Sequence, residues 1–92
     1  MIKSFTHKGL KQFFQKSQAK GLSAEMRPRV RRVLDALDAA QSPDELNIPG
    51  FGLHPLKGDR KGTWAVRITG NWRITFRFEK TDVTDVDLED YH

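Results

Sequence analysis

Two groups of residues with chemically active side chains lie far apart in the sequence. One pairs His54 with Lys57, and the other is the tripeptide Asp90-Tyr91-His92. An imidazole exchanges protons near neutral pH, and a lysine ammonium is a compact cation that neutralises phosphate. RNA is cleaved when its 2′-hydroxyl attacks the adjacent phosphate, which takes a base, a cation and an acid. Together with arginine, the two groups supply these three without a metal ion.

Each of these residues also has a common structural role. A single histidine more often lies at the surface or packs than catalyses, Tyr91 can simply pack its ring, and His92 can fray. A metal site from His54, His92, Asp59 and Asp90 is conceivable, but the sequence has none of the usual zinc spacings. We therefore expect neither a metal nor any other cofactor.

The second half of the sequence has the period-two alternation of β-strands. Apolar residues alternate with polar ones in segments 63–69 and 71–79, and the Gly-Asn dipeptide at 70–71 predicts a two-residue hairpin turn. A last strand is expected to carry Val86 and Leu88 as its inward anchors.

Basic side chains occupy the polar phase of these strands. Arg73, Thr75 and Arg77 should share the face opposite the core, joined by Arg67 from the neighbouring strand. A guanidinium donates two parallel hydrogen bonds to a phosphate, so this face is a candidate RNA-binding surface. On periodicity alone, an ordinary solvated face is the more common interpretation. The RNA-binding candidates are Lys57, Arg60, Arg67, Arg73 and Arg77.

Two helices are expected before the sheet. An apolar stripe predicts the first over residues 8–18, after a short strand over residues 2–5. Ser23 is a candidate N-cap for the second, although Pro28 is tolerated only in a first turn and so favours a later start. Helices followed by an antiparallel meander predict an α+β fold, in which both N-terminal helices pack on one face of an antiparallel β-sheet. The chain is expected to be one domain, 1–92.

The charge is unevenly distributed over a chain of 92 residues with net charge +4. Residues 1–41 contain nine Lys or Arg and three acidic residues, whereas residues 78–92 contain six acidic residues and one lysine. This basic body indicates an anionic partner. The absence of cysteine excludes disulfides and a thiol nucleophile. No signal peptide or membrane span is apparent, so a cytoplasmic location is expected.

Five segments resemble one protein family. They are Met1–Phe5, Leu34–Ala40, Leu53–Arg60, Gly70–Phe76 and Val86–His92. Together they are similar to the HigB-type ("host inhibition of growth") toxins of the RelE superfamily of bacterial toxin–antitoxin systems. The resemblance covers essentially the whole chain, and it is the combination of Leu53–Arg60, Gly70–Phe76 and Val86–His92 that is specific.

The resemblance implies a RelE-like, microbial-ribonuclease-like fold and a toxin that enters the ribosomal A site and cuts mRNA there. It implies neutralisation by a HigA-type helix-turn-helix antitoxin, and the free toxin is expected to be a monomer. The implied catalytic positions are His54, Lys57, Arg73, Asp90, Tyr91 and His92. Which histidine is the base and which the acid stays open. Candidates for docking on ribosomal RNA are Arg27, Arg29, Arg31 and Arg32.

Three other functions stay open at this point. One is a ribonuclease that needs no ribosome, and another is a non-cleaving, ribosome- or RNA-binding inhibitor of translation. The third is a structural or protein-interaction module. Cleavage of naked RNA would favour the first, and arrested translation with intact mRNA would favour the second. Harmless overexpression would favour the third.

Overall fold

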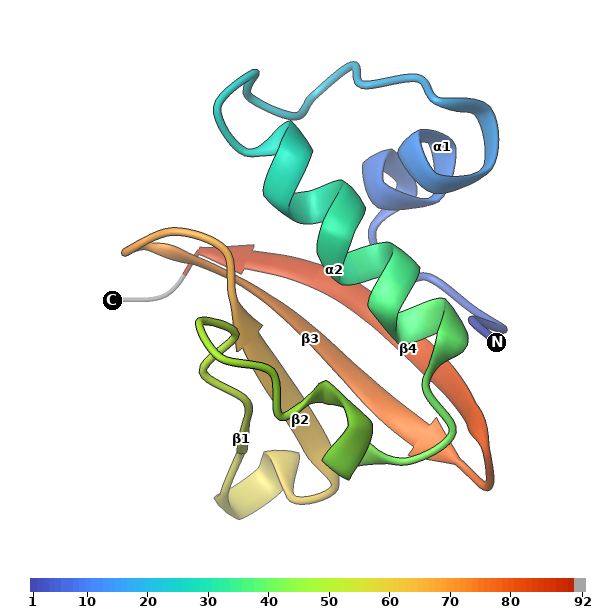
Figure 1. Ribbon diagram of the computed structural model, residues 1–92, viewed down its shortest axis with the longest axis vertical. Coiled ribbons are helices and arrows are strands. Elements are labelled where there is room, and N and C mark those ends of the chain that lie inside the picture. The colour runs from blue at the N-terminus through green and yellow to red at the C-terminus, as the bar shows by residue number, and fades with distance from the viewer. Residues whose placement is uncertain (91–92) are drawn as a thin grey trace.

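The computed structural model describes residues 1–90, and the predictions for Tyr91 and His92 lie outside these described residues. Helices come first and the sheet follows, as the ribbon in Figure 1 shows. In chain order the elements are α1 Lys8–Lys16, α2 Arg27–Ala39, the 3-10 turn Pro43–Leu46, β1 His54–Pro55, the 3-10 turn Gly58–Arg60, β2 Thr63–Arg67, β3 Trp72–Glu79 and β4 Asp82–Asp90.

The four strands form one sheet in the order β1-β2-β3-β4, and all neighbouring strands are antiparallel. Both helices lie on the same side of this sheet (Figure 1). The predicted α+β architecture is therefore confirmed. We call the side of the sheet away from the helices the open face.

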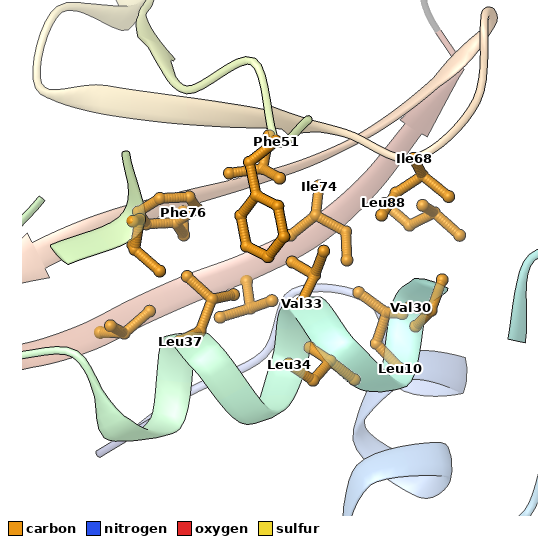
Figure 2. Close-up of a cluster of buried hydrophobic side chains, with 14 of the residues drawn as sticks. Leu10, Val30, Val33, Leu34, Leu37, Phe51, Ile68, Ile74, Phe76 and Leu88 are labelled. Atoms are coloured by element: carbon orange, nitrogen blue, oxygen red, sulfur yellow. The ribbon is translucent and has the colours of Figure 1, made fainter. Parts of the chain in front are cut away.

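Helix α2 supplies much of the core. Val30, Val33, Leu34 and Leu37 recur at helical spacing and are fully buried. Figure 2 shows them facing apolar side chains of the sheet and of Phe51. This packing fixes which side chains of each strand point away from the helices, and so it determines the open face.

The helix starts later than its candidate N-cap suggested. Arg27 is its first residue and Met26 its N-cap, so Ser23 as N-cap was wrong. Pro28 lies in the first turn, where its missing N–H removes no helical hydrogen bond. Helix α1 likewise ends at Lys16, because Ser17 adopts a left-handed conformation with φ 55°.

The expected first strand over residues 2–5 is reduced to two isolated parallel bridges, Ile2 to Val83 and Phe5 to Val86. Between these bridges Asp85 of β4 has a φ of 54°, which interrupts the regular pleat. There, Ser4 Oγ accepts a 2.8 Å hydrogen bond from the Asp85 backbone N–H. The N-terminal segment therefore follows β4 without forming a continuous ladder.

The predicted hairpin between β2 and β3 exists, but its turn is longer than two residues. Residues 68–71 connect the strands, and neither Gly70 nor Asn71 has the positive φ that a type I′ turn needs. Instead, Thr69 closes the turn, because its Oγ1 accepts a 3.2 Å hydrogen bond from the Trp72 N–H. The prediction of a two-residue turn was therefore wrong.

No helix within residues 1–90 has the length and hydropathy to cross a membrane.

Candidate active site on the open face

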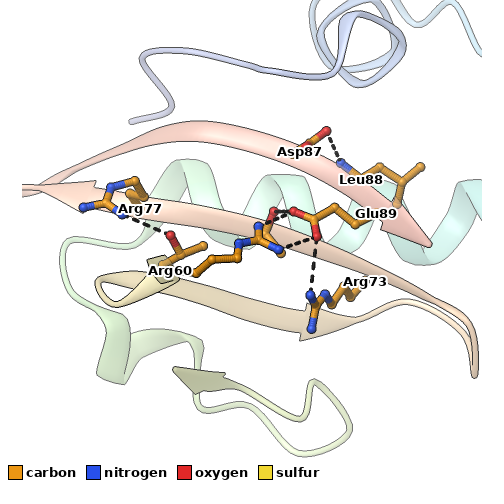
Figure 3. A network of polar contacts seen from close by, with 8 residues as sticks. Arg60, Arg73, Arg77, Asp87, Leu88 and Glu89 are labelled. Atoms are coloured by element: carbon orange, nitrogen blue, oxygen red, sulfur yellow. Dashed lines mark hydrogen bonds and ion pairs between the residues drawn. The ribbon is translucent and has the colours of Figure 1, made fainter. Parts of the chain in front are cut away.

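The alternation of β3 divides its side chains between two faces. Ile74 and Phe76 are fully buried toward the helices, so Arg73, Thr75 and Arg77 point to the open face, as the arginines do in Figure 3. The registers Arg67 to Arg73 and Thr63 to Arg77 place further polar residues beside them. The expected sharing of one face is thus found.

His54 belongs to the same face at the edge of the sheet. It pairs with Ala65, which pairs with Thr75, which pairs with Asp87, so one row crosses all four strands. The exposed imidazole has Nδ1 2.9 Å from the Gly52 carbonyl oxygen. Because a carbonyl oxygen only accepts, this bond requires a proton on Nδ1 and leaves the lone pair of a neutral ring on Nε2.

Glu89 lies at the centre of the polar contacts on the open face (Figure 3). Its Oε1 accepts from Arg60 at 2.7 Å and from Arg73 at 3.4 Å. Its Oε2 accepts from Thr75 Oγ1 at 2.7 Å and from a second nitrogen of Arg60. We call Glu89, Arg60, Arg73 and Thr75 the Glu89 cluster.

These partners set the protonation state of Glu89. The hydrogen bond from Arg60 is the largest cause that lowers the pKa of the Glu89 carboxyl to about 2, and bonds from Thr75 and Arg73 act in the same direction against partial burial. The same hydrogen bond raises the pKa of Arg60. Glu89 is therefore ionised at every physiological pH.

The open face consequently carries both signs of charge rather than a uniform positive surface. A hollow of about 230 Å³ lies between arginines of the sheet region and carboxylates of β4. Arg77 donates to Thr63 Oγ1 at 3.0 Å, and the Arg67 guanidinium packs beside Gly52. Among residues 1–90, neither Arg67 nor Arg77 forms an ion pair with a carboxylate. Both guanidiniums are exposed, and neither contacts the Glu89 carboxylate.

Lys57 follows β1 at one edge of the sheet, whereas Asp90 ends β4 at the other edge. Lys57 lines an apolar hollow of about 390 Å³ together with Pro55 and Trp64. Asp90 is exposed at the end of β4, opposite Trp72 and next to the Arg73–Glu89 pair. Asp90 has the phase of the buried Leu88 and not that of Glu89, so the alternation places it beside the Arg73 end of the sheet but not on the open face.

Three of the four arginines named for RNA docking are hydrogen-bonded within the protein. Arg27 donates to the Leu22 carbonyl, Arg29 to the carbonyls of Gly50 and Arg67, and Arg31 to the carbonyl of Phe13. Arg32 is exposed, and its guanidinium lies 5.5 Å from the centre of the Phe51 ring. Among residues 1–90, Arg32 is therefore the one of the four whose guanidinium has no hydrogen bond to the protein.

Glu89 is the residue of this site that the sequence reasoning did not identify. The alternation of Asp87 and Glu89 with the buried Leu88 in the last strand is the sequence pattern that indicates it. This alternation predicts the face of the sheet on which Glu89 lies. It does not predict that Arg73 is its partner, because that depends on the register between β3 and β4.

Comparison with known proteins places the sequence among bacterial toxins. The HigB-like toxin family, described as RelE-like toxins of the type II toxin–antitoxin system HigB, matches residues 3–92. "Endoribonuclease HigB" of Proteus vulgaris is 48% identical over 92 residues, covering 100% of both chains. "Toxin HigB-1" of Vibrio cholerae is 31% identical over 80 residues, covering 85% of this chain and 84% of that protein.

Solved structures share the fold at lower sequence identity. A YoeB–YefM complex from Staphylococcus aureus matches with a TM-score of 0.64 and 16% identity, over 100% of this chain and 98% of that one. A YoeB/ParE toxin from Agrobacterium tumefaciens matches with a TM-score of 0.64 and 23% identity, over 100% and 99%.

Proposed function

The chain belongs to the HigB-like family of RelE-like toxins of type II toxin–antitoxin systems, and from this premise we propose that it is a ribosome-dependent endoribonuclease. It cuts mRNA in the ribosomal A site and so inhibits translation. The observation that carries this proposal is the 48% identity, over the full length, to a relative named an endoribonuclease.

The proposed chemistry needs no metal ion. A base takes the proton of an RNA 2′-hydroxyl, the 2′-oxygen attacks the adjacent phosphorus, and the bond from phosphorus to the 5′-oxygen breaks. An acid then protonates the leaving 5′-oxygen. The products are a 2′,3′-cyclic phosphate and a 5′-hydroxyl end.

His54 and His92 share the acid and base roles in this proposal. The hydrogen bond from His54 Nδ1–H to the Gly52 carbonyl supports His54 as the base, because it leaves Nε2 to accept the proton. His92 is then the acid. Tyr91 orients a nucleotide or hydrogen-bonds the reacting group, and Asp90 orients an imidazole or contacts the RNA.

Positive side chains stabilise the crowded phosphate. Arg73 and Lys57 hold the scissile phosphate, whose charge increases as the 2′-oxygen attacks. Arg60, Arg67 and Arg77 contact neighbouring phosphates, and such contacts position RNA without reading its sequence. The exposure of Arg67 and Arg77 supports this role.

Docking on ribosomal RNA is assigned to basic residues on the helix side of the molecule. They are Arg27, Arg29, Arg31 and Arg32 of α2, together with lysines of α1. In the cell, a HigA-type helix-turn-helix antitoxin in the cytoplasm neutralises the toxin, in keeping with membership of a toxin–antitoxin family.

Purified ribosomes programmed with a defined mRNA test the function. We expect wild type to cut the mRNA, and His54→Ala, Arg73→Ala and His92→Ala to lose most of that activity. Asp59→Asn, an exposed residue of the same loop, serves as a matched control. Undiminished cleavage by His54→Ala and His92→Ala would refute the assignment of these residues. Arrested translation with intact mRNA would favour the non-cleaving inhibitor instead.

A further inference from the structure

We propose that Glu89 is a positioning residue, whose carboxylate fixes the guanidinium of Arg73 and ties segment 54–60 to the end of β4. The inference rests on the proposed function, because it concerns the same RNA-cleaving site. It assigns a role in catalysis to a residue that neither holds a proton in the reaction nor contacts the RNA.

The carboxylate joins three parts of the site that come from distant segments. Arg60 belongs to the 3-10 turn that follows β1, the strand that begins at His54. Arg73 belongs to β3, and Glu89 precedes Asp90 at the end of β4. Among residues 1–90, the hydrogen bonds and ion pair between the side chains of this turn and β4 are those from Arg60 to Glu89. The sheet places these segments beside one another, and the Glu89 carboxylate adds the side-chain contacts that hold Arg60 and Arg73 against the end of β4.

The geometry uses the full acceptor capacity of the carboxylate. Two oxygens offer about four lone-pair positions, and two arginines and a threonine fill them with four contacts. Thr75 is 2% exposed, so the hydroxyl that holds Oε2 is itself fixed within the sheet. A rotation of the Glu89 side chain would break several of these bonds at once.

A fixed guanidinium matters because an arginine side chain has many rotamers. Ordering it costs conformational entropy if it is free before RNA binds. The Arg73 side chain is 15% exposed and the Glu89 side chain 21%, so their contact lies at the floor of the open face. We infer that Glu89 holds Arg73 in the orientation that meets the phosphate, before the RNA arrives.

The opposite role is equally testable. A carboxylate beside Arg73 also weakens the positive potential that attracts phosphate. If Glu89 acted only as such a competitor, its removal would tighten RNA binding and raise the rate. Positioning predicts a loss, so the two roles differ in sign.

The experiment measures kcat and KM separately for mRNA cleavage on ribosomes. We expect Glu89→Gln to lower kcat by about 100-fold, the size of effect that a misplacement of about 1 Å produces, with a much smaller change in KM. Glu89→Asp should also lower kcat, because it keeps the charge but shortens the reach to the three donors.

Asp87→Asn is the matched control. It removes one negative charge from the same strand and the same face, and Asp87 forms no ion pair within residues 1–90. Its Oδ1 accepts from the Leu88 N–H, which an asparagine oxygen can also do. We expect kcat close to that of wild type, and thermal unfolding confirms that each variant is folded at the assay temperature.

Each outcome decides the inference. Provided that the wild type cuts mRNA, three results would overturn it. They are a wild-type kcat for Glu89→Asp, equal effects of Glu89→Gln and Asp87→Asn, and a raised kcat/KM for Glu89→Gln. A wild type that does not cut mRNA on ribosomes refutes the proposed function instead.

Discussion

The ionised carboxylate of Glu89 is stabilised in the folded protein by three side chains that all donate to it. Its pKa is lowered from 4.5 to about 2, so folding favours the charged form. A carboxyl group with a lowered pKa stabilises the fold above its unfolded pKa and loses that contribution as the pH falls toward its folded pKa. This single group therefore makes stability pH-dependent in the acid range.

We expect Glu89→Gln to lower the free energy of unfolding by about 1–2 kcal/mol at neutral pH. The Arg60 side chain is 43% exposed, so solvent screening keeps the effect below what the full pKa shift would give. The difference from wild type should shrink as the pH falls from about 5 toward 2. Urea unfolding at a series of pH values measures it, and a difference that stays constant across this range would contradict the cause.

Thr75→Val tests the hydroxyl that holds Glu89 from within the sheet. Valine has nearly the same shape, so the change removes the 2.7 Å hydrogen bond with little effect on packing. We expect a loss of about 1 kcal/mol in the free energy of unfolding. Thr81→Val, at an exposed turn, is the control and should have little effect.

At the scale of elements, an arginine of α2 contributes to the contact between the two helices. Arg31 donates to the Phe13 carbonyl at 2.8 Å, and its guanidinium lies 4.4 Å from the centre of the Phe13 ring. The neighbouring Arg32 is exposed. Adjacent residues of the same type therefore have different tasks, one between helices and one at the surface.

The pair Arg31→Gln and Arg32→Gln separates stability from docking. We expect Arg31→Gln to lower the free energy of unfolding by about 1–2 kcal/mol, because it loses a hydrogen bond and a cation–π contact. Arg32→Gln should change stability less and ribosome affinity more. Thermal unfolding and ribosome co-sedimentation measure the two effects, and the reverse ranking would refute the assignment.

Local sequence patterns were sufficient for the faces of the elements. The alternation around Arg73 and Phe76 predicted which residues of β3 face the helices, and Pro28 indicated the late start of α2. The Glu89 cluster could not be predicted in this way. Its formation depends on the pairing of Arg73 with Glu89, and β4 contains an irregularity at Asp85 that no local pattern reveals.

At the scale of the whole molecule, the positive charge is concentrated away from the last strand. Exposed lysines of α1 surround a hollow of about 390 Å³ beside Phe5, whereas β4 is acidic. A basic surface binds nucleic acid with release of counterions, so affinity falls as salt rises. The proposed function accordingly assigns ribosomal RNA to the helix side and mRNA to the open face.

Replacing Lys8, Lys11 and Lys16 by glutamine tests this division. We expect a weaker ribosome affinity and a shallower dependence of log affinity on log salt, with unfolding little changed because all three side chains are exposed. Lys80→Gln, at the turn between β3 and β4, is the control. An unchanged salt slope for the triple variant would place the docking surface elsewhere.

The central claim is that this chain cuts mRNA on the ribosome through attack of the RNA 2′-hydroxyl. The most direct test compares two mRNAs on the same ribosomes, one all-ribose and one with a single 2′-deoxynucleotide on the 5′ side of the scissile phosphate. We predict cleavage of the first, leaving a 2′,3′-cyclic phosphate and a 5′-hydroxyl, and no cleavage of the second at that position. Cleavage of the deoxy-substituted mRNA at the same position, or a 5′-phosphate on the product, would contradict the account.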